Sequence, residues 1–165
     1  GRQISGFGSA GASLGGQAPA GDQRLVELKS LRIGDLRLGR VPAVRRDLSP
    51  SLIGARMLEN FVVTLDVKSG TAYIEQFRDA PFKHSTFGFT LAFGQNISVA
   101  TVWQPSAAYD QGLRAGTRIH TINGVPAEGT SAGIRRAMDA MGGQDVSITW
   151  DGGSATLEKV TLFQR

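Results

Sequence analysis

The sequence lacks several of the residues on which common catalytic sites depend. It contains no cysteine and only two histidines, His84 and His120. The absence of cysteine excludes disulfides and thiol catalysis. The two histidines show no metal-ligand spacing, so no metal centre is indicated. No apolar run approaches the ~20 residues of a membrane-spanning helix.

Basic residues outnumber acidic residues only slightly. There are 18 Lys and Arg residues against 14 Asp and Glu, a net charge of +4. A nucleic-acid-binding domain would gather such an excess on one face. Only Arg40, Arg45 and Arg46 form a cluster, which we interpret as a solvated surface. Nucleic acid is therefore not an expected partner.

Glycine is abundant, with 22 residues, and 41% of the chain is hydrophobic. Glycine adopts positive φ without strain, so this excess is typical of many turns between short elements. The apolar share is enough for a packed core. We predict a mainly β protein with short helices, of the α+β class.

The first half shows the pattern of two β-hairpins. Apolar runs at 25–33 and 36–44 flank Gly34-Asp35, which predicts the first hairpin. Phe61, Val63, Leu65 and Val67 recur at every second position, which predicts a half-buried strand that returns over 72–76. Residues 1–23 have little to bury, and we expect them to be disordered or to associate with another chain.

Residues 78–81 are polar and end in Pro81, so we divide the chain there into domains 1–78 and 82–165.

The second half alternates strands with two helices. Strands are predicted at 86–93, 97–103, 118–122, 146–150 and 155–162. A short helix at 107–111 begins after Ser106 as N-cap and ends before Gly112. A longer helix at 131–141 has Ile134, Met138 and Met141 on one face. Asn123-Gly124 predicts a type I′ turn.

The second half also resembles a bacterial PDZ domain. The motifs that carry this resemblance are Pro105-Ser106-Ala107-Ala108, Gly112-Leu113-Arg114-Ala115-Gly116 and Ile122-Asn123-Gly124. Thr117 departs from the aspartate that this family often has. The resemblance implies that peptides or protein C-terminal tails add a strand to a sheet edge. The peptide-binding residues would be Phe87, Gly88, Phe89, Thr90, Leu91, Ile134 and Met138. Each apolar member of this set is equally compatible with an ordinary core position.

The first half is similar to the later part of a retropepsin-like aspartic peptidase domain. The stretches that carry this similarity begin GRQISGFGSAGAS and continue with LRIGDLRLGRVPAV and SLIGARMLENFVVTLDVKSGTAYI. The similarity implies a substrate-covering flap at Gly6, Phe7 and Gly8. It also implies a turn at Leu52-Ile53-Gly54 and a short helix at 55–60. The same glycines fit a Gly-x-Gly-x-x-Gly pattern, but no full strand precedes it, and Gly15, Gly16 and Pro19 would break a helix after it, so no dinucleotide or other cofactor is expected.

The peptidase similarity lacks its catalytic element. Aspartic peptidases share a proton between two carboxylates, which Asp-Thr-Gly or Asp-Ser-Gly loops supply. Neither tripeptide occurs in the sequence. We therefore predict no catalytic residue in this chain, and we expect the catalytic segment of a parent aspartic endopeptidase to lie upstream of Gly1. The resemblance also implies a bacterial envelope or periplasmic location.

Three functions remain open at this point. The chain is a peptide-binding module, a substrate-handling part of a peptidase, or a structural domain whose groove is filled by the chain itself or by a partner. The incomplete sheet of the first half also predicts a homodimer through that half, because exposed strand edges pair readily with other chains.

Overall fold

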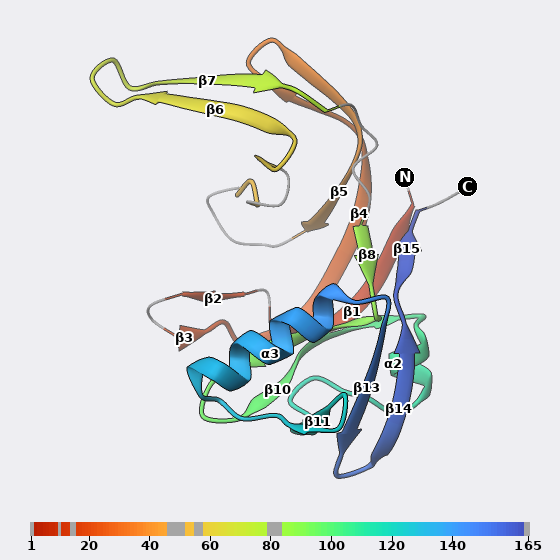
Figure 1. Cartoon of the computed structure of the whole chain (residues 1–165). Coiled ribbons are helices and arrows are strands. Elements are labelled where there is room, and N and C mark those ends of the chain that lie inside the picture. The colour runs from red at the N-terminus through yellow and green to blue at the C-terminus, as the bar shows by residue number, and fades with distance from the viewer. Residues whose placement is uncertain are drawn as a thin grey trace.

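The protein is mainly β, and a computed structural model describes residues 2–9, 11–13, 16–45, 52–54, 58–78 and 84–163. The strands of the first half are β1 (Gln3–Ser9), β2 (Ala12–Ser13), β3 (Gly16–Gln17), β4 (Ala20–Ile33), β5 (Leu36–Arg45), β6 (Phe61–Asp66) and β7 (Thr71–Gln76). Those of the second half are β8 (His84–Thr86), β9 (Phe89–Phe93), β10 (Ile97–Gln104), β11 (Ile119–Ile122), β12 (Val125–Pro126), β13 (Asp145–Trp150), β14 (Gly153–Glu158) and β15 (Val160–Leu162). Two described helices, α2 (Ala107–Asp110) and α3 (Ser131–Gly142), belong to the second half (Figure 1).

One five-stranded sheet joins the two halves of the chain. Its order is β5-β4-β1-β10-β9, and neighbouring strands are antiparallel. Strand β1 lies between the halves, because Gly6 is opposite Gln23 of β4 on one side and Trp103 of β10 on the other. The expectation of disorder or intermolecular pairing for residues 1–23 is therefore wrong for the described part of that segment, which pairs within the chain.

Two glycines allow β1 to lie against β10. A Cβ atom at Gly6 would come within 2.5 Å of the Trp103 ring, and one at Gly8 within 2.1 Å of the Ala100 carbonyl oxygen. Gly8 also has a φ of 150°, which residues with a side chain rarely adopt. The Thr101 hydroxyl donates to the Ser9 carbonyl across the same junction. The glycine-rich composition of this segment thus has a packing cause inside a strand.

The two hairpins of the first half form as the sequence predicts, but the expectation of a half-buried strand is wrong for β6, in which only Phe61 is buried and Val63 and Leu65 are exposed. Gly34 has a φ of 58° in the tight turn between β4 and β5. Strands β6 and β7 pair over their whole length. A small core cluster of Leu38, Val41 and Phe61 lies in this part of the molecule. Figure 1 shows the β6–β7 hairpin extending across the end of the molecule opposite to α3.

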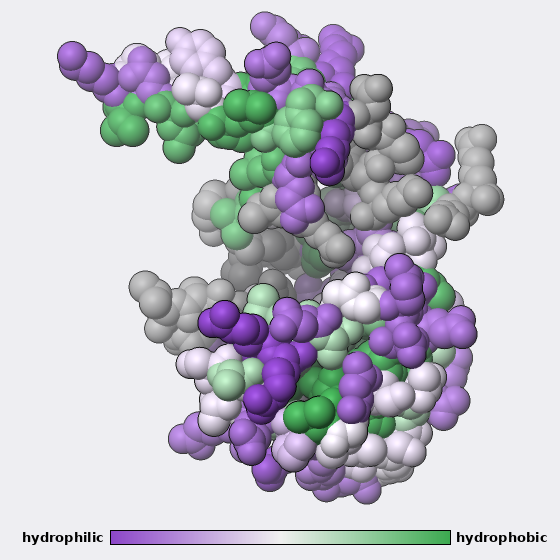
Figure 2. Space-filling model, viewed as in Figure 1, coloured by the Kyte–Doolittle hydropathy of each residue, from purple (hydrophilic) through white to green (hydrophobic). Residues whose placement is uncertain are grey.

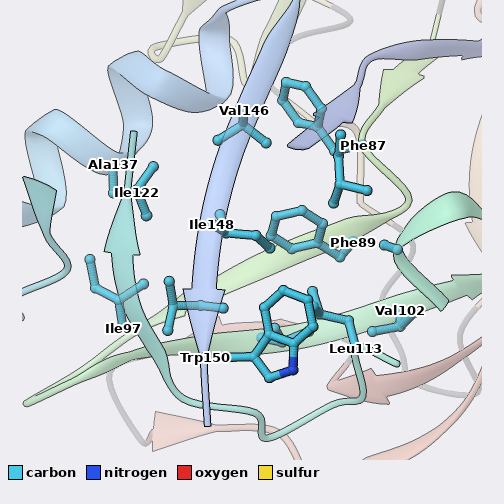
Figure 3. Close-up of a cluster of buried hydrophobic side chains, with 14 residues drawn as sticks. Phe87, Phe89, Ile97, Val102, Leu113, Ile122, Ala137, Val146, Ile148 and Trp150 are labelled. Atoms are coloured by element: carbon cyan, nitrogen blue, oxygen red, sulfur yellow. The ribbon is translucent and has the colours of Figure 1, made fainter. Parts of the chain in front are cut away.

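The second half is a compact body around a larger core. Strands β12-β11-β13-β14 form one sheet, and β15 pairs with β8 in another. Side chains from β9, β10, β11, β13 and α3 meet in one cluster (Figure 3). Its fully buried members include Phe89, Ile97, Leu113, Ile119 and Ile148. The core therefore belongs to the segment 84–163, while the first half attaches to it through β1.

Several local predictions for the body are confirmed. The Ser106 hydroxyl caps α2 by accepting from the Tyr109 amide, and Gly112 follows with a φ of 93°. Asn123 and Gly124 both have positive φ, as a type I′ turn requires. Helix α3 covers the predicted span and extends one residue further, to Gly142.

Other predictions need correction. The predicted strand at 86–93 is interrupted at Phe87-Gly88, and the predicted strand at 155–162 is divided at Lys159 into β14 and β15. Residues 52–54 are exposed and irregular, Leu58 is helical, and Glu59 and Asn60 form a turn. Residues 55–57, which the predicted short helix includes, lie outside the described residues.

Candidate functional site

The two outer strands of the five-stranded sheet differ in how their edges are protected. The edge strand β5 carries Arg37, Arg40, Arg45 and Pro42, and Arg40 has a φ of 54°. Charged residues, proline and irregular backbone are the usual means of preventing an edge from pairing. The opposite edge strand, β9, reads Phe-Thr-Leu-Ala-Phe and contains none of them. Among the residues that the structure describes, no strand pairs with the outer side of β9, which leaves this edge available to an added strand.

The backbone of β9 presents hydrogen-bonding groups to that open side. The Trp103 amide donates to the Gly88 carbonyl, so Gly88 bonds towards β10. Alternation along an antiparallel strand then directs the backbone groups of Phe89 and Leu91 away from β10. Val99, which is opposite Leu91, confirms this pattern because its own backbone bonds to Gly116 and Thr117 on the other side of β10.

Helix α3 is the second element of the site. The Thr130 hydroxyl accepts from the Gly133 amide and caps the helix. Gly133 and Ala137 are buried and attach the helix to the body. Ile134, Met138 and Met141 follow at i, i+4 and i+7 on one flank, and Met138 is 60% exposed.

The other flank of α3 borders a separate pocket. This pocket has a volume of 270 Å³, and Ile122, Val125, Arg136 and Asp139 are among its lining residues. The flank of α3 that carries Ile134 and Met138 therefore faces away from this pocket. Leu91 of β9 and Met141 of this second flank both pack against the core cluster that contains Ala137.

Helix α3 and strand β9 are connected at both ends. At the helix start, Gly129 lies so close to the end of β9 that a Cβ would meet the Gly94 carbonyl at 1.9 Å. At the helix end, the Lys159 Nζ donates to the Met141 carbonyl at 2.8 Å and lies 4.9 Å from the centre of the Phe87 ring. The helix and the strand thus run antiparallel to each other.

The loop before β9 has a glycine for reasons of packing. Gly88 has a φ of 88°, and a Cβ there would lie 2.5 Å from the Ser106 Cβ. Its amide donates to the Thr86 hydroxyl at 3.1 Å, and its carbonyl also lies 3.5 Å from the Ser106 hydroxyl. Gly88 therefore lies tightly between Thr86 and the start of α2.

The residues that the sequence predicted to bind peptide lie on β9, on the turn before it and on α3, in different environments. Phe87 and Phe89 are 3% and 1% exposed, so their side chains belong to the core. Leu91 and Ile134 are half-buried, whereas Thr90 and Met138 are exposed. Lys159 was not found by sequence reasoning, because a single lysine between two strands has no distinctive pattern.

Catalytic elements are sparse among the described residues. His120 Nε2 lies 2.5 Å from Asp151 Oδ1, and both side chains are exposed. In the described part of the chain, no group of three or more His, Cys, Asp or Glu side chains is arranged to hold a metal ion, and no helix is long and apolar enough to cross a membrane. Gly6, Phe7 and Gly8, the predicted flap, lie within β1, and Phe7 is 53% exposed.

Comparisons with models of known protein families, with curated proteins and with solved structures found no match to this chain. What the site can bind therefore has to be inferred from its own geometry. That geometry, in the described part of the chain, is an uncharged strand edge, an antiparallel helix with an apolar flank, and Lys159 near one end of both.

Proposed function

We propose that the chain is a peptide-binding module of the PDZ type, which takes up an extended peptide as an additional strand along β9. The unprotected edge of β9, beside the apolar flank of α3, carries this proposal. Strand addition uses backbone hydrogen bonds for affinity and alternate side chains for selection. A bound peptide would direct every second side chain towards Leu91, Ile134 and Met138, so it should carry apolar residues at those positions.

The proposal is tested with an array of heptapeptides that end in a hydrophobic residue. The strongest binder is then resynthesised with N-methyl groups at the two amides that would face β9, and its affinity is measured by fluorescence polarisation. Each lost backbone hydrogen bond is worth roughly 1 kcal/mol, so we expect at least about tenfold weaker binding. Methylation at the alternate amides, which face away from β9, is the matched ligand control.

The helix wall is tested with Met138→Asp. A charge at this exposed position leaves the core intact but disfavours an apolar peptide, and we expect binding to weaken about tenfold or more. Ala132→Asp introduces the same charge on an exposed position of α3 away from this flank. If Met138→Asp and Ala132→Asp bind the peptide equally well, the groove is not the binding site. Phe89 is unsuitable for this test because it is buried in the core.

We also infer that the module belongs to an aspartic peptidase. The support is the sequence similarity of residues 1–77 and the hairpins β4–β5 and β6–β7 at the expected positions. Because the chain has no Asp-Thr-Gly or Asp-Ser-Gly, it should not cleave protein substrates. Pepstatin-sensitive cleavage by the purified chain of 165 residues would contradict this inference.

A structural role has separate support in the β6–β7 hairpin. One of its faces carries Val63 and Leu65, 37% and 68% exposed, and Val67 beyond the strand is 90% exposed. Figure 2 shows apolar side chains along the side of this hairpin that faces the rest of the molecule. An isolated two-stranded hairpin is only marginally stable in water. We propose that a second copy of the chain covers this face in a homodimer.

A further inference from the structure

Arg40 of β5 ties residues near the C-terminus to the first half of the chain. Its Nη2 donates to the Phe163 carbonyl at 3.1 Å, across 123 positions of sequence. The same guanidinium forms a bidentate pair with Glu27 of β4, in which Nε and Nη2 each lie 3.2 Å from one carboxylate oxygen. Such a fork fixes the direction of a guanidinium as well as its charge. Arg40, which the sequence pattern assigned to a solvated cluster, therefore connects the β4–β5 hairpin with the residue that follows β15.

Both residues of this attachment have a strained backbone. Arg40 has a φ of 54° and Phe163 a φ of 60°. Residues with large side chains rarely adopt this region, and they remain in it where surrounding contacts hold them. Loss of the hydrogen bond between them would let both backbones relax. A released state therefore competes with the docked state seen in the structure.

Residues 159–163 form a strap that runs from the end of α3 to this attachment. At its start, the Lys159 Nζ donates to the Met141 carbonyl at 2.8 Å and lies 4.9 Å from the centre of the Phe87 ring. Strand β15 then pairs with β8 through three residue pairs (Figure 1). Because Phe87 lies between β8 and β9, the strap contacts the chain at the point where the proposed peptide-binding strand begins.

We infer that the strap 159–163, docked on Arg40, is a latch that couples the β9 edge to the first half of the chain. When Phe163 leaves Arg40, the strap is held by its short pairing with β8, and the turn before β9 loses a firmly placed neighbour. A peptide that pairs with β9 orders this turn and so favours the docked strap. By linkage, the docked state binds peptide more tightly than the released state. The coupling rests on the proposed peptide-binding function, whereas the latch itself does not.

The latch is tested by hydrogen exchange in the unaltered chain and in Arg40→Met. We expect the amides of β8 and β15 to exchange about tenfold or more faster in the variant, because charge-assisted hydrogen bonds are lost and the strap opens locally. The amides of β13 in the core should keep their rates. Arg37→Met removes the same charge from an exposed position of β5 and should leave β8 and β15 unchanged. Unchanged rates of β8 and β15 in Arg40→Met, or an equal increase in Arg37→Met, overturn the latch.

A milder variant decides the case in which Arg40→Met also loosens the core. Glu27→Gln keeps the size of the side chain but removes the charge that orients the guanidinium. We expect a smaller increase of the exchange rate, confined to β8 and β15. An increase that extends to β13, or none at all, overturns the latch.

The coupling is tested with the strongest heptapeptide from the array. Saturating peptide should slow exchange of the β15 amides in the unaltered chain, and Arg40→Met should bind the peptide about fivefold or more weakly. Arg37→Met should bind it as the unaltered chain does. Equal affinities of the unaltered chain and Arg40→Met overturn the coupling while the latch stands. Absence of peptide binding by the unaltered chain overturns the proposed function and the coupling with it, and the exchange rates still decide the latch.

Discussion

The compact body and the β6–β7 hairpin use similar apolar residues with opposite results. In the body, Phe89, Ile148 and Val146 are at most 1% exposed because three sheets and two helices enclose them. In the hairpin, Leu65 and Val67 remain largely exposed because only one pair of strands is present. The difference shows that alternation along a strand predicts which residues share a face, while burial depends on whether another layer covers that face.

The most direct way to test this comparison is to remove one large side chain from each region. Phe89→Ala should lower the free energy of unfolding by about 3–5 kcal/mol, because it leaves a cavity in an enclosed core. At concentrations below those of the proposed dimer, Leu65→Ala should change it by no more than about 0.5 kcal/mol, because the side chain is then in water. Urea unfolding followed by tryptophan fluorescence measures both. Equal losses would mean that the hairpin is enclosed by its own chain.

The junction between the two regions is tested by a pair of glycines with the same backbone angle. Gly8 and Gly11 have φ values of 150° and 149°, but only Gly8 has atoms in the way of a side chain. Gly8→Ala should therefore cost about 2 kcal/mol more than Gly11→Ala, because it adds overpacking against β10 to the same backbone strain. The rate of hydrogen exchange at the β1 and β10 amides should rise in Gly8→Ala and stay unchanged in Gly11→Ala. Similar exchange in both variants would show that β1 does not depend on close packing.

The exposed face of the hairpin should become visible as self-association. We expect the unaltered chain to form dimers at micromolar to millimolar concentration, and Leu65→Asp to weaken dimerisation about tenfold or more because it places a charge in an apolar contact. Thr64→Asp adds the same charge to the opposite face of β6 and should have little effect. Sedimentation equilibrium measures all three proteins. A monomeric unaltered chain throughout this range would contradict the homodimer.

The smallest expected effect concerns the turn of the same hairpin. The Ser69 side chain and the Ser69 and Lys68 amides hydrogen-bond to the Asp66 carboxylate and lower its pKa. Because the folded pKa is lowered, the turn is stabilised above the unfolded pKa and loses this contribution as the pH falls through the folded pKa. NMR titration of the Lys68 and Ser69 amides should show the loss, and Asp66→Asn should abolish its pH dependence. The body, in contrast, should show no coupled change.

Much of the local structure could be predicted from particular residues. The turn at Asn123-Gly124, the cap at Ser106 and the spacing of Ile134 and Met138 each identified an element correctly, because they depend on backbone conformation and on neighbours along the chain. The candidate site was only partly predictable. Phe89 and Leu91 were expected to line a pocket together, yet the structure buries Phe89 fully and leaves Leu91 at the surface of the core.

What the sequence determined by itself is the set of hairpins, turns and helices, and the absence of a catalytic Asp-Thr-Gly or Asp-Ser-Gly. What only the tertiary structure decided is how these elements meet. Gly6 and Gly8 admit β1 between the two halves, and Lys159 joins the end of α3 to Phe87. Such contacts connect residues far apart in the chain, so they depend on distances that local periodicity does not encode. The open edge of β9 is of this kind, since a strand is an edge only in relation to the sheet around it.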